Sequence, residues 1–387
     1  KLSYSLTADR GPSSVTNSRV VIMAENPWRP SAGDNESSLY IAQLANNELT
    51  YEKKHELNFG IDAGFLNNRI NFTFDIYSRR NYDLIGVINT LGTGGEPRKY
   101  GNVAKMKSNG VEIALNTVNI KTKDFTWTTD LIYSHMHNEV TELNTLNRMY
   151  DYISGSGFTM PGYPQRSLFS IPFMGLNNEG LPTFLDQDGN VSVTGINMQE
   201  YDPERLKFLK YEGPVDPTDV GSLGNVFRYK GVTLNLFITY SFGNVVRLDP
   251  VFSSSYSDLT ATPKEFKDRW VKPGDENFTN VPVIASKQQL NNIAYLSTAY
   301  QAYNYSTERV AKGDFIRMKE ISLGYEFPKS ITQPLRLSNL SLKLMATNLF
   351  LIYADKKLNG QDPEFFNAGG VANPMPKQFT LTLKLGI

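Results

Sequence analysis

Residues 377–387, at the end of the chain, read KQFTLTLKLGI. The apolar residues of this stretch recur at every second position and are Phe379, Leu381, Leu383, Leu385 and Ile387. Side chains two residues apart lie on the same face of a β-strand, so the pattern predicts a strand with one apolar and one polar face. Such a strand needs a neighbour on each side. The pattern therefore predicts the closing strand of an outer-membrane β-barrel, with lipid on one face and a wet lumen on the other.

The same alternation recurs upstream and predicts further strands. They fall at residues 1–9, 56–65, 69–77, 111–120, 125–138, 221–229, 232–242, 315–327 and 340–350. Because each spanning strand reverses the direction of the chain, 166–220 must hold an even number of spanning strands. The total is therefore ten strands with none there, or twelve with two. Ten is preferred, with 167–176 as a strand beside the lumen or above the rim.

The connections alternate between short and long. The short ones are Asn67-Asn68, 121–123, 230–231 and 328–338. The long ones are 9–51, 83–107, 139–166, 243–313 and 352–376. Outer-membrane barrels have short periplasmic turns and long extracellular loops, so this layout predicts such a barrel with its carboxyl terminus in the periplasm. Structureless loops of this length would count against an ordinary compact domain.

Composition limits the classes of function. Lys+Arg and Asp+Glu both number 39, so no excess of positive charge predicts a nucleic-acid partner. Mean hydropathy is −0.36, and no apolar run of about 18 residues predicts a transmembrane helix. A barrel strand is apolar on only one face, so this value is compatible with a membrane barrel. Cysteine is absent, which excludes disulfides and thiolate–metal sites within the chain.

The start of the chain, KLSYSLTAD, already alternates. No signal peptide precedes it, so we expect the chain to begin within a protein or after processing. A closed barrel of ten or twelve strands is one interpretation. Half of a larger barrel fits better, because the chain begins inside a strand and contains no plug-like α/β segment.

Several short motifs occur in a characteristic order. They are KLSYSLTADRG at 1–11, LTYEK at 49–53, NFGID at 58–62, the run from Asn68 to Tyr77, NGVE at 109–112, DFTW at 124–127, GNVFRYKG at 224–231, WVKPGD at 270–275, GDFIRMK at 313–319, TNL at 347–349 and QDPE at 361–364. Together they resemble the carboxyl-terminal part of SusC/RagA-type TonB-dependent outer-membrane transporters. The resemblance covers nearly all 387 residues. Two positions depart from the family pattern: Tyr51 replaces the usual Trp, and the chain ends in Ile387 rather than an aromatic residue.

The resemblance implies an all-β fold, in which residues 1–387 form the second half of a large, 22-stranded, plugged transmembrane antiparallel barrel with long extracellular loops. It implies active import of oligosaccharides or oligopeptides across the outer membrane, without enzymatic activity or a cofactor. The implied partners are a SusD-like surface lipoprotein that acts as a lid, the amino-terminal plug and barrel portion, TonB through that portion, and membrane lipid. The plug and the TonB box match nothing in this chain.

Two alternatives come from other functional classes. A soluble β-sandwich that binds or cleaves glycans would need a second sheet to cover the apolar faces. A passive, porin-like barrel would need this chain alone to close and conduct. The half-barrel start and the ordered motifs argue against both.

Metal-binding candidates are weak. Asp186, Asp188 and Asn190 resemble the start of a calcium loop, but Asn197 stands where such a loop needs Glu, so we prefer an Asp-Gly turn. His135 and His137 share a strand face without a third ligand nearby in sequence, so we interpret them as polar rim or lumen residues.

Two further patterns have plainer interpretations. Glu112 and Asp130 lie opposite the apolar stripe, and we interpret them as solvated lumen groups rather than an acid/base pair. The run Gly92-Thr93-Gly94-Gly95 lacks the lysine of a phosphate-binding loop, and we interpret it as part of an external loop.

Aromatic residues are the candidates for substrate contact. Those in the longest loop are Trp270, Tyr295, Tyr300, Tyr303 and Tyr305, and those in the loop 139–166 are Tyr150, Tyr152, Phe158 and Tyr163. Their rings could stack on sugars or pack on peptide side chains. Packing among the loops, or contact with a lid protein, is the preferred alternative. A second aromatic set is assigned to the membrane interface and comprises Trp127, Tyr133, Tyr240, Tyr325 and Phe350.

Overall fold

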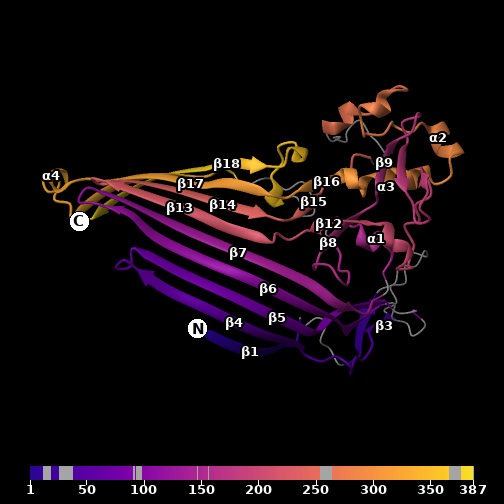
Figure 1. Cartoon of the computed structure of the whole chain (residues 1–387), viewed down its shortest axis with the longest axis horizontal. Helices are drawn as coiled ribbons and strands as arrows, with labels where there is room; N and C mark the ends of the chain where they lie inside the picture. Colours follow the sequence, from indigo (N-terminus) through magenta and orange to yellow (C-terminus); the bar gives the residue numbers. More distant parts are fainter. Residues whose placement is uncertain are drawn as a thin grey trace.

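Ten long strands form one antiparallel sheet (Figure 1). The computed structural model describes residues 1–11, 19–25, 38–89, 92, 98–145, 147–155, 157–252, 264–365 and 376–386. In spatial order the strands are β1 (Leu2–Asp9), β4 (Glu52–Phe65), β5 (Ile70–Asn89), β6 (Arg98–Lys121), β7 (Phe125–Leu143), β13 (Asp219–Tyr229), β14 (Val232–Phe242), β17 (Phe315–Glu326), β18 (Asn339–Ala354) and β19 (Gln378–Gly386). The predicted count of ten is confirmed, and 166–218 contributes no strand to this sheet.

Strand register places apolar residues beside one another on one face. Phe59 of β4 lies opposite Ile76 of β5, and Leu344 of β18 lies opposite Leu381 of β19. These side chains are exposed, Leu381 by 68%. Polar residues line the other face, where Asp75 lies opposite Glu112. A large exposed apolar face on a folded sheet requires a nonaqueous environment or a partner to cover it.

The short connections lie together at one end of the sheet. Asn67 and Asn68 adopt positive φ in the turn between β4 and β5, as the sequence predicts for asparagine. Lys230 and Gly231 also adopt positive φ in the turn between β13 and β14. Helix α4 (Lys329–Thr332) and the described end of the chain lie at this same end (Figure 1). Ile387 lies outside the described residues.

The strands extend further toward the long connections than predicted. The segment 83–107, expected to be a loop, is mostly the continuation of β5 and β6. The reason is a change of register near Asp83, which has positive φ, after which Leu84 lies opposite Ala104. Such a bulge lets a ladder continue beyond a break in the alternating pattern. The connection 9–51 contains the hairpin of β2 (Val21–Glu25) and β3 (Ser38–Gln43).

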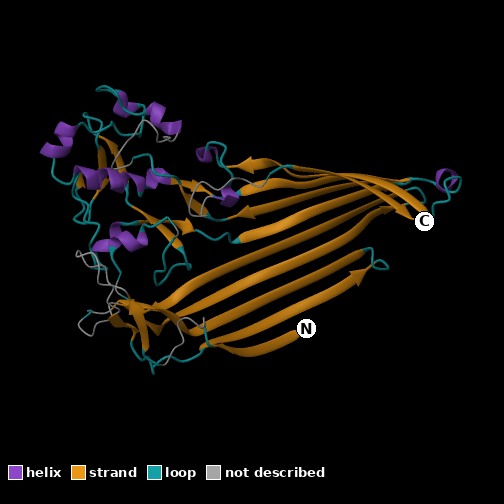
Figure 2. Cartoon of the chain, turned by 180° about the vertical axis from the view of Figure 1, so that it is seen from behind, coloured by secondary structure: helices purple, strands orange, loops and turns teal. Residues whose placement is uncertain are grey.

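The expectation that the other long connections lack structure is wrong for most of 139–166 and 243–313. Together with 166–220 they form a loop module, here the described residues of 144–218 and 243–314, at the opposite end of the sheet (Figures 1 and 2). Its strands are β8 (Ser167–Ser170), β9 (Phe173–Leu176), β10 (Pro182–Leu185), β11 (Val191–Ser192), β12 (Lys210–Pro214), β15 (Val245–Arg247) and β16 (Val310–Lys312). Its helices are α1 (Met149–Tyr152), α2 (Lys287–Asn292) and α3 (Leu296–Asn304), with 3-10 turns η1 (Arg205–Phe208), η2 (Lys264–Asp268), η3 (Asp275–Asn277) and η4 (Thr307–Arg309).

A hydrophobic core explains why these connections fold. Ile153, Phe169, Phe184 and Tyr303 are at most 2% exposed and belong to one contiguous cluster. They come from several chain segments, so the connections stabilise one another. A smaller cluster around Val246 includes Leu358 of η5 (Lys356–Leu358) and thereby attaches the last long connection, which also contains η6 (Pro363–Phe365). No helix within the described residues is long and apolar enough to cross a membrane.

Two substitutions at adjacent residues of β19 test which face of the sheet contacts lipid. We expect the apolar face to contact hydrocarbon, so Leu381→Arg should lower the free energy of unfolding by about 2–4 kcal/mol, the usual cost of a lipid-facing arginine at the midplane. Thr382→Arg, on the polar face of the same strand, should leave it almost unchanged. The measurement is denaturant unfolding of the full-length protein in lipid vesicles. Equal effects of the two substitutions would contradict the assignment of the faces.

Candidate functional site

A buried arginine joins separate segments of the loop module to one another. Arg247 of β15 is 8% exposed. Its Nη1 donates to Ser170 Oγ at 3.0 Å and to the Ser306 carbonyl at 2.9 Å. Its Nη2 donates to the carbonyls of Phe169 at 2.7 Å and Ile153 at 3.4 Å. One guanidinium therefore joins β15, β8, α1 and the start of η4.

The charge of Arg247 is balanced mainly by these oxygen dipoles. Burial lowers the pKa of Arg247 to about 10, and the negative charge of Glu212 acts against this decrease. The guanidinium thus stays protonated at neutral pH. A buried cation that donates to carbonyls of several segments holds those segments in fixed positions relative to one another, because each hydrogen bond must keep its length.

A second arginine fixes the last long connection. Arg317 of β17 is 4% exposed and forms ion pairs with Asp362 at 2.5 Å and Glu364 at 3.0 Å. Both carboxylates belong to the QDPE motif, so this motif closes over the end of β17. Removal of one partner of such a buried ion pair strongly destabilises the folded state, because the other charge stays buried without a partner.

A cavity of about 770 Å³ lies between the loop module and the loop-side ends of β5, β6 and β7. Its sheet side includes Met106 and Val140, which are opposite each other in register. Met106 is an even number of residues from Glu112 on β6, and Val140 is an even number of residues from Asp130 on β7. Met106 and Val140 therefore lie on the polar face of the sheet. Thr159 lines the module side. The volume is in the range of cavities that hold small organic ligands.

The cavity combines an apolar lining with a charged rim. Its aliphatic lining includes Leu84, Val87 and Leu143, and its rim includes Arg148 and Asp151. The two rim charges pair with each other at 3.2 Å across the first turn of α1. Such a surface can bind apolar groups and orient polar ones.

Most of the predicted loop aromatics are used in packing. Tyr300 and Tyr303 are buried in the module core, Tyr152 is buried between Phe158 and Phe169, and Phe158 lines the cavity. Burial raises the pKa of Tyr152 and of Tyr303.

The remaining loop aromatics differ in exposure. Trp270 is 8% exposed and donates from Nε1 to Glu276 at 2.8 Å. Tyr305 is half-buried against Tyr150, and burial together with this contact raises its pKa to about 12. Tyr163 packs on Phe169. Tyr295 alone among the predicted loop aromatics has an exposed ring, at 74%, so substrate contact through these rings stays a prediction that is best directed at Tyr295.

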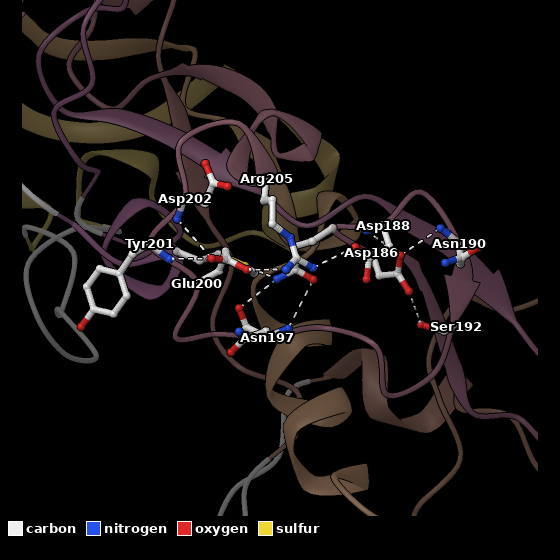
Figure 3. Close-up of polar contacts among 11 residues, drawn as sticks. Asp186, Asp188, Asn190, Ser192, Asn197, Glu200, Tyr201, Asp202 and Arg205 are labelled. Carbon is white, nitrogen blue, oxygen red and sulfur yellow. Dashed lines mark hydrogen bonds and ion pairs between the residues drawn. The ribbon is translucent and has the colours of Figure 1, made fainter.

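The candidate calcium loop is a tight hairpin turn between β10 and β11 (Figure 3). Asp186 Oδ1 accepts from the backbone N–H groups of Asp188 and Asn190, at 3.0 and 2.9 Å, and Oδ2 accepts from Ser192 Oγ. Asp188 pairs with Arg205 at 2.8 Å. The carboxylates are thus occupied by the turn, and the described residues contain no group of three or more possible acidic or histidine metal ligands.

The other candidates are dispersed. His135 Nδ1 lies 2.9 Å from Asp219 Oδ1, which also accepts from the Tyr133 hydroxyl at 2.6 Å. His137 lies on the same face of β7. Glu112 lies opposite Ser134, and Asp130 lies opposite Asn116, which donates to it. The two carboxylates therefore do not form a pair. Gly92 has positive φ, whereas Thr93, Gly94 and Gly95 lie outside the described residues.

The aromatics assigned to the membrane interface lie on the apolar face. Trp127 stacks on Phe227 near the end with the short turns, and Tyr325 lies in the row opposite Leu342 at the same end. Tyr133 and Tyr240 flank Gly221 in one row closer to the loop module. Phe350 lies opposite Met318 in register, and its side chain is 52% exposed. Their contact with a membrane interface stays a prediction.

Arg247 and the cavity were not predicted from the sequence. Arg247 follows Val245 and Val246 and precedes Leu248, and a cation inside an apolar run is a signal of burial. The cavity had no local signal, because its walls come from strands and loops far apart in the sequence.

These features define the wall of a β-barrel whose loops form a folded module at one end. The chain belongs to the TonB dependent receptor-like, beta-barrel family, whose model matches residues 26–249. The family comprises receptors rather than enzymes.

Comparisons with individual proteins give the same result. The chain is similar to TonB-dependent receptor P39 of Formosa agariphila, at 26% identity over 86% of this chain and 34% of that protein. It is similar to TonB-dependent receptor SusC of Bacteroides thetaiotaomicron, at 26% identity over 92% of this chain and 34% of that protein. The chain thus spans about a third of the length of these relatives.

A solved structure shares the fold. The structure of the RagAB peptide transporter matches with a TM-score of 0.74 and 24% identity, and the match covers 100% of this chain and 40% of that one. The aligned arrangement therefore corresponds to part of a longer chain in that structure.

Loss of the Arg247 hydrogen bonds should loosen the loop module. Arg247→Met removes the donor from several buried oxygens, each of which costs about 1–3 kcal/mol when left unsatisfied. We expect protease cleavage within the loop module to increase strongly while the ten long strands stay protected. The measurement is limited proteolysis of the detergent-solubilised full-length protein, with fragments identified by mass spectrometry.

Arg205→Met is the matched control. The Arg205 side chain is 44% exposed and pairs with Asp188 at the surface, an interaction worth at most about 1 kcal/mol. It should leave the cleavage pattern unchanged. If Arg247→Met also leaves the pattern unchanged, Arg247 does not hold the module together.

Proposed function

We propose that this chain forms the carboxyl-terminal wall of a SusC/RagA-type TonB-dependent transporter that imports oligomeric nutrients across the outer membrane. Membership of the TonB-dependent receptor family supports this proposal. The observation that carries it is the two-faced, ten-stranded sheet with its folded loops at one end. In this proposal the apolar face contacts lipid, the polar face lines the lumen, the loop module lies outside the cell, and the carboxyl terminus lies in the periplasm.

The two edges of the sheet support a larger barrel. Within the described residues β1 and β19 each pair with one neighbour only. Unpaired backbone N–H and C=O groups cost several kcal/mol each in hydrocarbon, so both edges require further strands. We assign these strands, the plug and the TonB contact to the amino-terminal portion of the same transporter. A barrel of about 22 strands has a plugged lumen, so transport requires the plug to move.

The loop module is the surface for substrate and for a lid. The cavity lies where Met106 and Val140 reach the lumen-facing side of the wall. A substrate that enters from outside passes this cavity before it reaches the plug. We propose that a SusD-like lipoprotein covers the module and delivers an oligosaccharide or an oligopeptide to the cavity. The apolar lining suits the aliphatic side chains of peptides and the apolar faces of sugar rings.

A cavity-filling substitution tests this function. Thr159→Trp places a large ring in the cavity and should lower TonB-dependent uptake several-fold. The measurement is growth of cells that carry the full-length transporter, with peptide or oligosaccharide mixtures as the limiting nutrient, in the presence and absence of TonB. Growth that depends on the transporter but not on TonB would contradict active import.

Val191→Trp provides the matched control. Val191 is 58% exposed in the β10–β11 hairpin and does not line the cavity. Its replacement should leave uptake unchanged. Equal uptake by wild type and Thr159→Trp would show that substrate does not pass through the cavity.

A further inference from the structure

A row of charged residues crosses the apolar face of the sheet from strand to strand. In consecutive register pairs, Leu6 of β1 lies opposite His55 of β4, His55 opposite Arg80 of β5, Arg80 opposite Lys107 of β6, and Lys107 opposite Glu139 of β7. Side chains directly opposite on neighbouring strands lie about 5 Å apart at Cβ. The row therefore brings three potentially cationic groups together.

The position of the row matches the outer boundary of the hydrocarbon layer. The apolar stripe of β4 starts at Phe65, beside the short turn, and His55 lies ten residues away along the strand. At a rise of about 3.3 Å per residue and a tilt of about 40°, this corresponds to a height of about 25 Å. The lipid-facing band of outer-membrane barrels is also about 25 Å tall. His55, with Arg80 opposite it on the adjacent strand, thus lies at the level of the lipid headgroups.

Aromatic residues around the row support this level independently. The Tyr4 hydroxyl lies 2.7 Å from His55 Nδ1, and the Tyr82 ring packs edge-on against His55 with centroids 5.4 Å apart. Tyr4 is 65% exposed. Tyrosine is enriched at membrane–water interfaces because its ring is apolar and its hydroxyl is polar. We call Tyr4, His55, Arg80, Tyr82 and Lys107 the Arg80 patch.

Arg80 is the member of the patch whose charge is not balanced. Lys107 pairs with Glu139 at 2.9 Å. The neighbouring Arg79 points to the opposite face, where it pairs with Glu56 at 2.8 Å. Arg80 is exposed and forms no ion pair with any carboxylate of the described residues. An unpaired guanidinium at the edge of hydrocarbon gains most from an anion supplied by the headgroup layer.

We propose that the Arg80 patch binds the phosphate group of an anionic lipid in the outer leaflet. Arg80 donates two parallel hydrogen bonds to the phosphate, because the planar guanidinium matches phosphate geometry. Lys107, beside Arg80, donates a further hydrogen bond to the phosphate, and Tyr4 and Tyr82 pack on the apolar part of the lipid. This inference rests on the proposed function, which places the apolar face in the outer membrane. It adds a lipid site to the outer wall, remote from the substrate cavity.

The test measures lipid retention by the full-length transporter. The protein is placed in nanodiscs that contain phosphorylated lipid A, or the same lipid after removal of its phosphates, and bound lipid is counted by native mass spectrometry after transfer to detergent. Wild type should retain the phosphorylated lipid and lose the dephosphorylated one. The double variant Arg80→Gln, Lys107→Gln should retain roughly tenfold less, the effect of losing about one charge-assisted hydrogen-bond pair.

Arg228→Gln is the matched control, because Arg228 is an exposed arginine on the opposite face of β13. It should retain lipid as wild type does. Equal retention by the double variant and wild type, or equal retention of both lipids, overturns the inference. Displacement of the lipid by inorganic phosphate alone would assign the patch to free phosphate and overturns it also.

Entry into nanodiscs and the growth assay together separate this inference from the proposed function. If the protein enters nanodiscs and imports nutrients in a TonB-dependent manner, but the double variant retains lipid normally, only the lipid site is wrong. If the folded protein is water-soluble and does not enter nanodiscs, the membrane function fails and the lipid site fails with it.

Discussion

The hydrogen-bond ladder of the ten-stranded sheet is the constraint on which the rest of the structure depends. A backbone in hydrocarbon must satisfy its N–H and C=O groups internally, and neighbouring antiparallel strands do so along their whole length. The ladder also fixes side-chain direction, so Leu381 and Thr382 must lie on opposite faces. The apolar wall and the polar lining therefore follow from one alternating pattern. The same constraint explains why β1 and β19 require further strands beyond the sheet.

The ladder also determines where function can reside. Antiparallel strands return every second connection to the same end, so the long connections meet there and can pack on one another (Figure 1). Their core around Phe169 and Tyr303 makes them a folded module instead of separate loops. Arg247 then ties the segments of the module together, and Arg317 of β17 ties the QDPE segment to the sheet. A rigid wall thus carries a shaped surface, in which the cavity beside Val140 is the proposed place for substrate contact.

Sequence alone predicted the sheet better than the module, for physical reasons. The period of two in 56–65 and 377–387 is a local signal, and it located the spanning strands and their number. The strand extensions beyond Asp83 were missed because a bulge interrupts the period there. The module core was missed because Phe184 and Tyr303 meet only through tertiary packing. For the same reason, the sequence could not distinguish exposed Tyr295 from buried Tyr300, although packing among the loops was the preferred interpretation.

The central claim is that the sheet is a barrel wall with lipid on one face and water on the other. Its most direct test is a scan of single cysteines through residues 379–384 of the full-length protein in lipid vesicles, and this chain contains no cysteine of its own. Each cysteine carries a fluorophore, which is quenched either by a lipid-attached or by a water-soluble quencher. The account predicts lipid quenching at 379, 381 and 383 and aqueous quenching at 380, 382 and 384. Aqueous quenching at all six positions would contradict it.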